Sequence, residues 1–302
     1  MALTRQGRRS GGPGVRAALV FLLPLAVFYG TFYLYSFWFL ISTSFLKTDI
    51  TQSNSTFVGL QNYELVLSHD VFWTALFNTF AFSIVAIIAG LTIAFFLAVM
   101  LATRPRGSRF LYAIFLLPSL MPMSLVASVF AVMLESRFGF VNEGLRAIGL
   151  GGLAQRWLVD PNLAWGSVAM IFVYVIGLPI MYYTADLATM NVSLIEAAVV
   201  DGAGARQLLR FILYPALSGA RRTIMTAVPL MGFRAFEIVF LSTHGGPAGR
   251  TEIAGTYLYT FATSGTNVGY VSAASVIVLA IALLIAILQL RRQHRSDRRA
   301  AP

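Results

Sequence analysis

The sequence lacks cysteine altogether and has few charged residues. Without cysteine, disulfides, thiolate nucleophiles and cysteine-based metal sites are excluded. The three histidines, His69, His244 and His294, each lack a second ligand at metal-binding spacing, so we expect no bound metal. No G-x-x-x-x-G-K-[ST] stretch occurs, so this chain should bind no nucleotide itself.

Hydrophobic residues are what the sequence has in excess. They form 58% of its 302 residues, against 11% charged residues, and the mean hydropathy is +0.76. A soluble domain of this size could not bury so much apolar surface. The composition therefore indicates a polytopic membrane protein.

Six apolar stretches are long enough to cross a bilayer, whose hydrocarbon core of about 30 Å requires about 20 helical residues. They lie near Ala17–Phe45, Trp73–Leu101, Phe110–Leu134, Asn162–Leu187, Thr223–Leu241 and Tyr270–Leu290. We therefore predict an all-α fold with six transmembrane helices within residues 17–290. A basic tail of residues 1–16 precedes this domain, and another of residues 291–302 follows it.

The basic residues predict the orientation of these spans. If both termini are cytoplasmic, sixteen of the 22 lysines and arginines face the cytoplasm and five face outward. Cytoplasmic loops of membrane proteins carry such an excess. Because topology explains the net charge of +10, nucleic acid is not expected as a partner.

The polar segment between the fourth and fifth spans, residues 189–222, is the most informative part of the chain. This topology places it in the cytoplasm. Ser193 and Glu196 have the spacing of a capping box at a helix start, and Gly202 can end this helix in a left-handed conformation. A second helix is predicted from about Ala205. The apolar face of the first helix consists of Leu194, Ile195, Ala198 and Val199. By itself the pattern also suits an amphipathic connector on the membrane surface.

The stretch from Glu196 to Ala203, EAAVVDGA, with Ile212 and Pro215 after it, resembles the EAA loop of permease subunits of binding-protein-dependent ABC importers. Four other stretches resemble the maltose-permease-F-like carbohydrate uptake family in the same order. They are Phe57–Tyr63, Asn78-Thr79, Leu241–Pro247 and Gly269–Ser275. The resemblance implies the MetI-like fold of type I importer permeases, in the cytoplasmic (inner) membrane of a bacterium or archaeon.

This resemblance also implies partners. They are a second permease subunit that completes a heterodimer, two copies of a cytoplasmic ABC ATPase, and an extracytoplasmic solute-binding protein. ATP and Mg would bind to the ATPase, and this chain would hold no cofactor. The implied solute is an oligosaccharide, disaccharide, polyol or glycerol phosphate derivative.

In such importers the EAA helix docks into a groove of the ATPase. Residues 189–222 would then be the coupling loop, and Glu196 would supply the charged contact. Ala197 and Ala198 would allow close approach, and Gly202 would permit the turn. Asp201 and Ala203 complete the expected docking residues.

Polar and aromatic residues within the predicted spans are candidates for the solute pathway. Arg234 and Glu237 lie three positions apart, so they share a helix face and can pair. A charge at membrane depth costs about 2.5–3.5 kcal/mol and usually faces protein or a cavity. These two residues therefore pair with each other, extend their charged groups towards the outer surface, or bind solute. Asn78 either bonds a neighbouring helix or lines the pathway, and Tyr174 either stacks on a sugar ring or anchors its span at the interface.

Two other classes of function are weighed against the importer. A membrane enzyme would need a nucleophile and a base at membrane depth, and the sequence offers only Arg234 with Glu237 there. A stand-alone secondary transporter is the alternative function, and it would usually have more spans or recognisable repeats with broken helices. Co-purification with an ATPase separates the importer from this alternative.

Overall fold

The structure, a computed structural model, describes residues 13–51, 55–233, 235–263 and 267–300. Helices dominate these ranges, and the one strand pair within them is β1 (Leu46–Lys47) with β2 (Thr56–Phe57), which run antiparallel. The predicted all-α class is therefore confirmed.

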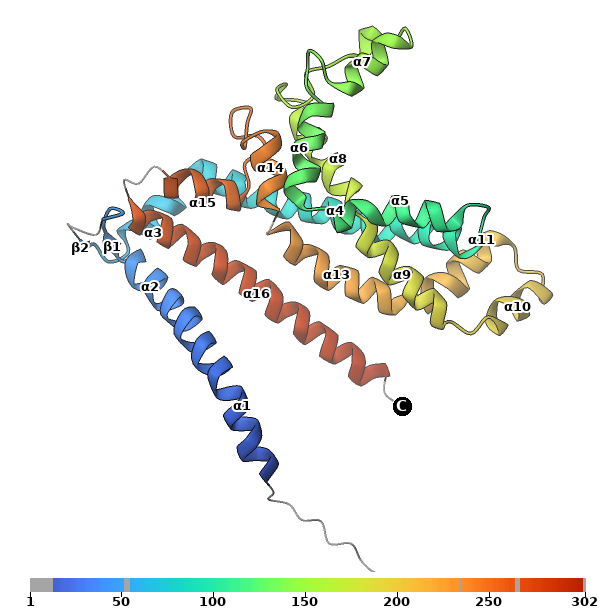
Figure 1. Cartoon of the computed structure of the whole chain (residues 1–302), viewed down its shortest axis with the longest axis horizontal. Coiled ribbons are helices and arrows are strands. Elements are labelled where there is room, and N and C mark those ends of the chain that lie inside the picture. Colours follow the sequence, from blue (N-terminus) through green and yellow to red (C-terminus); the bar gives the residue numbers. More distant parts are fainter. Residues whose placement is uncertain (1–12, 52–54, 234, 264–266, 301–302) are drawn as a thin grey trace, which may run out of the picture.

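The first helical run diverges from the rest of the molecule (Figure 1). α1 (Pro13–Tyr29), the π-helical turn η1 (Gly30–Leu34) and α2 (Tyr35–Ser44) follow one another without a break. Their apolar part is 27 residues long, and its most apolar window contains no buried residue. α2 packs against α16 (Val268–Ala300), whereas α1 stands apart. This run agrees with the first predicted span.

α4 (Asp70–Ala102) is the central helix of the bundle. It packs against α9 (Gly177–Thr189) and α13 (Ser218–Gly232). Small residues permit this contact, since a Cβ at Gly90 would lie 3.2 Å from the side chains of Pro179 and Ile224. Membrane helices commonly associate through such small residues.

The third predicted span is bent. α5 (Ser108–Leu120) and α6 (Met123–Met133) meet at an angle of 102°. Pro122 has no N–H to donate and disfavours helical geometry at the residue before it. Met121 accordingly adopts an extended conformation, with φ −77° and ψ 148°. The span predicted over Phe110–Leu134 is thus a pair of helices joined at a proline.

The fourth predicted span is interrupted but forms one apolar stretch. α8 (Ala164–Tyr174) and α9 are separated by Val175 and Ile176, and together they are 26 residues long. Gly177 begins α9 where α5 passes close by, because a Cβ there would lie 2.6 Å from the carbonyl oxygen of Phe115.

The fifth predicted span differs from expectation. α13 begins at Ser218, before the expected Thr223, and ends at Gly232; α14 (Phe236–Ser242) follows separately. α13 has 15 residues, too few to cross about 30 Å at about 1.5 Å each. The helix ends where it touches α4, since a Cβ at Gly232 would lie 1.8 Å from Ser83 Oγ. In the described ranges, four helices are long and apolar enough to cross a membrane, and the bent α5–α6 pair is a fifth candidate.

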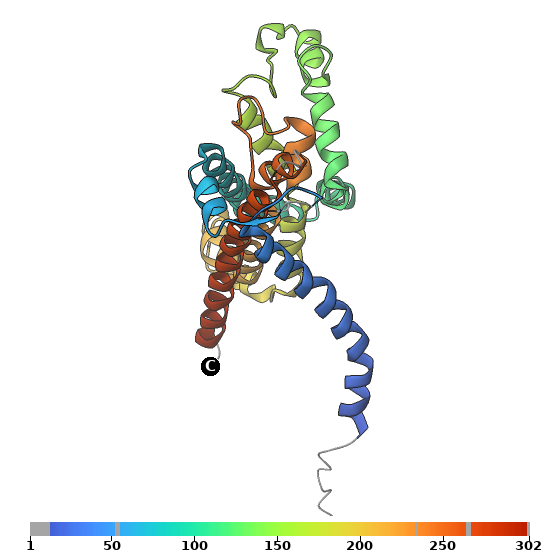
Figure 2. The same cartoon turned by 90° about the vertical axis from the view of Figure 1, so that its left-hand side faces the viewer.

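The end of α2 and the start of α16 are fastened together. The Asn62 amide donates to the carbonyl of Leu46 at 2.9 Å, and the N–H of Val268 donates to the carbonyl of Thr48 at 2.9 Å. α2 and α16 therefore run antiparallel, and the start of α1 and the end of α16 point to the same side of the molecule (Figures 1 and 2). α16 matches the last predicted span and remains helical to Ala300.

Buried apolar residues form separate clusters along the bundle. One joins α4, α9 and α13, and a second joins α4, α6, α8 and α14. A third joins α3 (Gln61–Leu67), α15 (Ala254–Thr263) and α16 to the start of α4, through Val66, Phe72 and Tyr257. The clusters hold the helices around α4, and the first one also includes Leu213 and Leu217 at the base of the loop between α9 and α13.

Candidate functional site

The coupling loop forms two short helical arms at one end of the molecule (Figure 1). The first arm is α10 (Ser193–Val200). The second arm is a continuous run of α11 (Ala205–Gln207), the π-helical turn η3 (Leu208–Leu213) and α12 (Tyr214–Ala216). The second arm thus begins at Ala205, as predicted.

The predicted capping box at the start of α10 is not formed. The N-cap position is Val192, and no side chain caps the helix there. Instead, Asn191 Oδ1 accepts the N–H of Ser193 at 3.1 Å. The chain is already helical at Val192, with φ −63° and ψ −27°, so the residue before it takes over the capping function. Glu196 remains exposed in the first turn, where the helix dipole favours a negative charge.

Gly202 ends α10 as predicted. Its φ is +82°, in the left-handed region. The N–H of Gly202 donates to the carbonyl of Val199 at 3.0 Å, and the N–H of Ala203 donates to that of Ala198 at 2.9 Å. This pair of bonds is the Schellman motif, which satisfies the last carbonyls of a helix. The turn therefore fixes the direction in which the chain leaves α10.

The exposed surface of α10 is strongly apolar. No residue of this helix is buried, and Leu194, Val199 and Val200 are 53%, 55% and 86% exposed. Ile195 is the residue of the predicted apolar face that contacts the bundle core. The predicted face is therefore divided, because one part anchors the arm and the rest is open to a partner.

A hollow of about 240 Å³ lies between the two arms. Its lining includes Ala198, Asp201, Gly202, Ala203, Gln207, Phe211 and Ile212. Four of the six predicted docking residues thus line one hollow. The other two, Glu196 and Ala197, are exposed on α10 beside it.

Asn78, a predicted pathway candidate, holds three parts of the fold together. It is 3% exposed. Its amide donates to the carbonyls of Arg250 and Glu252, at 3.0 and 2.9 Å. Its oxygen accepts the indole N–H of Trp165 at 3.1 Å. Both amide hydrogens and the oxygen are thus engaged, so the geometry favours the helix-bonding alternative.

The other pathway candidates within the described residues, Tyr174 and Glu237, lie on different helices. Tyr174 ends α8 and packs edge-on against Phe130 of α6, with ring centroids 4.9 Å apart. Glu237 lies in the first turn of α14 and is partly buried. Arg234 lies outside the described residues, so the predicted pair of Arg234 with Glu237 stays a prediction.

An apolar cavity of about 220 Å³ lies in the bundle, where the sequence had indicated only spans. It lies beside the end of α13, and Gly232 and Ala235 form part of its wall. The rest of the wall comes from α4, α6, α8, α9 and α14, and includes Ala86, Met123, Phe172, Pro179 and Ile238. No short sequence pattern predicts it, because these segments meet only in the folded bundle.

Glu252, before α15, is a further residue that sequence reasoning missed. Its Oε1 is buried and has no hydrogen-bond partner among the described residues. A Cβ at Gly245 would lie 2.0 Å from its Oε2, so the bare backbone of Gly245 leaves room for this carboxyl. Burial raises the pKa of Glu252 above its ordinary value.

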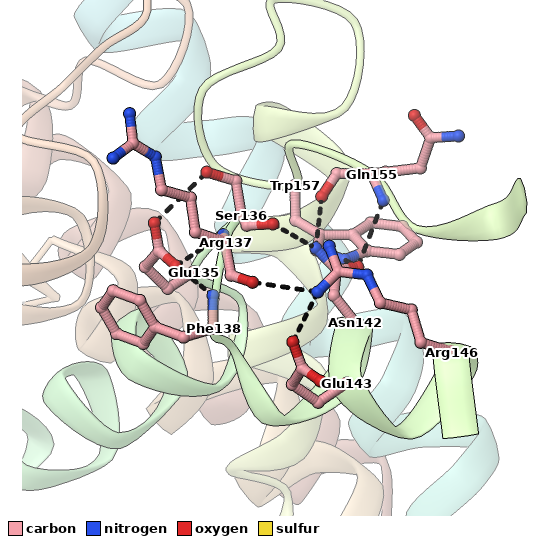
Figure 3. Close-up of polar contacts among 9 residues, drawn as sticks. All are labelled: Glu135, Ser136, Arg137, Phe138, Asn142, Glu143, Arg146, Gln155 and Trp157. Carbon is pink, nitrogen blue, oxygen red and sulfur yellow. Dashed lines mark hydrogen bonds and ion pairs between the residues drawn. The ribbon is translucent and has the colours of Figure 1, made fainter. Parts of the chain in front are cut away.

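Residues 134–163 form a small separate unit that contains α7 (Phe140–Ala147) and η2 (Gly151–Leu153), at the end of α6 and α8 (Figure 1). Asn142 is buried at its centre and bonds the backbone of Ser136 and Gln155 and the indole of Trp157 (Figure 3). The N–H groups of Phe138 and Arg137 donate to Glu135, which lowers the pKa of that carboxyl. These bonds connect the parts of the unit to one another.

Comparison with known proteins assigns the chain to a family. No protein-family model matches it. A probable ABC transporter permease protein of Pyrococcus horikoshii is 26% identical over 293 residues, 97% of this chain and 100% of that one. The sulfoquinovosyl glycerol transport system permease protein SmoG of Agrobacterium fabrum is 27% identical and is covered to 91%. The arabinooligosaccharides transport system permease protein AraP of Halalkalibacterium halodurans is 31% identical over 250 residues, 80% of this chain and 77% of that one.

Solved structures have the same fold. A chain of a bacterial ABC transporter for import of the acidic polysaccharide alginate has a TM-score of 0.77 at 20% identity, over 93% of this chain and 96% of that one. A chain of the MetNI methionine ABC transporter has a TM-score of 0.50 at 18% identity, over 73% and 94%. The predicted MetI-like fold is thereby confirmed. From its sequence similarity along most of both chains, the protein belongs to the family of ABC transporter permease proteins.

Proposed function

We propose that this protein is the transmembrane permease subunit of an ATP-driven importer for a carbohydrate or a related solute. It forms half of the translocation pathway. Support for the solute class comes from relatives named for arabinooligosaccharides and sulfoquinovosyl glycerol. Oligosaccharides, disaccharides, polyols and glycerol phosphate derivatives are the solutes to be tested.

The observation that carries this proposal is the exposed apolar surface of α10. This short helix lies outside the bundle, and the side chains of Leu194 and Val199 are exposed on it. An exposed apolar patch of this kind is typical of a surface that binds another protein. Glu196 and Asp201 add negative charge to the same arm. A cytoplasmic ATPase with an apolar, basic groove suits this arm. Ala197 and Ala198 let the groove approach the helix backbone, and the hollow between the arms receives a side chain of the ATPase.

The importer works with several partners. A second permease subunit completes the pathway, two ATPase subunits bind ATP and Mg, and an extracytoplasmic binding protein delivers the solute. A similar structure is that of an alginate transporter in complex with its periplasmic protein, which supports this last partner. The chain itself performs no catalysis and holds no cofactor in this proposal, because the energy comes from the ATPase.

Both ends of the chain are proposed to lie in the cytoplasm of a bacterial or archaeal cell, with the spans in the inner membrane. The antiparallel run of α2 and α16 supports ends on the same side. The arginines of the coupling loop, Arg206, Arg210, Arg221 and Arg222, support the cytoplasm as that side. In this orientation the unit around Asn142 faces outward.

The solute pathway is proposed to pass α14, with Arg234, Glu237 and Tyr174 as candidate contacts. An arginine can grip a phosphate or hydroxyl groups through paired N–H donors. At equal expression, Arg234→Ala and Glu237→Gln should raise the solute concentration for half-maximal uptake. Unchanged half-maximal concentrations in both variants would leave these residues only an ion-pair function.

Co-purification tests the whole proposal. An affinity tag on this chain should retain a second permease and an ABC ATPase in detergent. Vesicles that contain the complex should accumulate solute only when ATP is present on the side of the membrane where the ATPase lies. Glu196→Ala should reduce ATPase retention, whereas Glu143→Ala, an exposed charge on α7, should not. A lone chain that transports without ATP would instead establish the secondary transporter.

A further inference from the structure

Asp186 links the helix that leads into the coupling loop to the helix that follows it. It lies in the last turn of α9, and its Oδ2 accepts the N–H of Ala220, in the first turn of α13, at 2.5 Å. The first N–H groups of a helix have no partner within that helix. Leu217, the N-cap residue of α13, supplies no side-chain cap. Asp186 therefore caps α13 from a different helix, with a charge that the helix dipole favours.

Gly219 leaves the space that this bond requires. A Cβ at Gly219 would lie 2.8 Å from Asp186 Oδ2, which is closer than real Cβ contacts. A side chain here would therefore displace the carboxylate from the N–H of Ala220. The bond thus requires two features, a carboxylate on α9 that accepts the N–H and a glycine on α13 that leaves room for it.

Aromatic contacts hold the same region from the side of the second arm. The guanidinium of Arg221 lies over the ring of Tyr214, 3.8 Å from its centroid. Tyr214 packs edge-on against Phe95 of α4 at 5.7 Å, and Phe95 packs edge-on against Tyr183 at 5.6 Å. Tyr183 is fully buried one turn before Asp186. The base of the coupling loop is thus tied to α4, α9 and α13 together.

The backbone leaves helical geometry at each end of the coupling loop. Met190, after α9, is extended, with φ −71° and ψ 139°. Leu217, before α13, is also outside helical geometry, with φ −85° and ψ 29°. A push on α10 could be absorbed by rotation at these two residues unless α9 and α13 are fixed to each other near them.

We propose that Asp186 is a positioning residue for coupling. Its bond to Ala220 makes the last turn of α9 and the first turn of α13 move as one body, so that motion of α10 reaches α13 and its end at Gly232. This inference rests on the proposed function, because it assumes that an ATPase pushes on α10.

Replacement of the carboxylate tests the clamp. The complete transporter, with Asp186→Ala in this chain, is placed in vesicles, and both ATP hydrolysis and solute uptake are measured. We expect the ATPase to bind and hydrolyse normally while uptake falls, so that ATP consumed per solute rises about tenfold. A hydrogen bond to a charged group shifts an equilibrium by about this factor or more. Asp186→Asn should restore most of the uptake, because its amide oxygen can accept the same N–H.

Two further variants keep the test decisive. Gly219→Ala retains the carboxylate but displaces it, so it should reproduce Asp186→Ala even if that variant assembles poorly. Thr184→Ala is the matched control on α9, because its hydroxyl donates to the carbonyl of Met181 within the same helix. It should behave as wild type.

The clamp would be refuted if Asp186→Ala and Gly219→Ala both kept the wild-type ratio of ATP to solute. Equal impairment of Asp186→Asn and Asp186→Ala would also refute it, because the capping bond would then be irrelevant. Failure of the proposed function looks different, since ATP-dependent uptake would then be missing in wild type and in Thr184→Ala as well.

Discussion

A substitution at Gly202 should impair the coupling loop least when the new residue readily adopts a left-handed backbone conformation, and most when it cannot adopt one. The φ of Gly202 is +82°, and a Cβ there would meet no heavy atom within 4 Å. Space is therefore not limiting. The left-handed conformation costs an ordinary L residue about 1–2 kcal/mol, which is about a five- to thirtyfold loss in the population of the native turn. Asparagine, which tolerates this region, should lose less, and proline cannot adopt it.

ATPase retention by a tagged complex measures the effect. Retention and coupled uptake should fall in the order Gly202→Asn, Gly202→Ala, Gly202→Val, and Gly202→Pro should abolish both while the chain still inserts in the membrane. Gly204→Ala is the matched control two residues on, because Gly204 has φ −74° and ψ 166°, which any residue adopts. Wild-type uptake in Gly202→Pro would refute the docking assignment, and equal effects at both glycines would refute the backbone argument.

Three further predictions concern buried polar groups. Asn78→Leu should lower the thermal unfolding temperature, since three partner groups lose a hydrogen bond and each unpaired buried group costs about 1–3 kcal/mol. The solute concentration for half-maximal uptake should stay unchanged in the protein that folds. Glu252→Gln should stabilise the protein increasingly as pH rises. A carboxyl whose pKa is raised by folding contributes stability below its ordinary pKa of 4.5, and this contribution is lost as pH rises through the raised pKa, whereas glutamine does not ionise. A gain in stability that is independent of pH would contradict this. Asn142→Ala should make the α7 unit sensitive to limited proteolysis without change in ATPase retention, since its bonds lie within that unit.

Long apolar helices were the part of the fold that the sequence predicted well. α4 and α16 satisfy their own backbone bonds and need only an apolar composition, so their identity is local information. The bend between α5 and α6 was not part of the prediction of one span over Phe110–Leu134, and its angle of 102° depends on packing as well as on Pro122. The end of α13 at Gly232 was not predicted, and Gly232 lies against Ser83 of α4, which is far away in the sequence.

The same distinction applies to the coupling loop. Gly202 was predicted because a Schellman turn involves only neighbouring residues. The capping box failed for an equally local reason, since Asn191 precedes the expected cap and competes with it. Asp186 carried no signal, because its partner Ala220 lies 34 residues further on and an isolated acidic residue at a span end is usually solvated.

The coupling loop is exposed at its tip and buried at its base, as a segment that transmits motion from a partner to the bundle must be. The tip, α10, has no buried residue, so a partner can grip it without first unpacking the bundle. The base is the opposite, because Leu213, Leu217 and Ala220 are buried in the core shared with α4 and α9. A loop buried throughout could not reach a partner, and one exposed throughout would bend under load. Because the base includes the first turn of α13, any rigid displacement of the tip must also displace the helix that ends beside the apolar cavity.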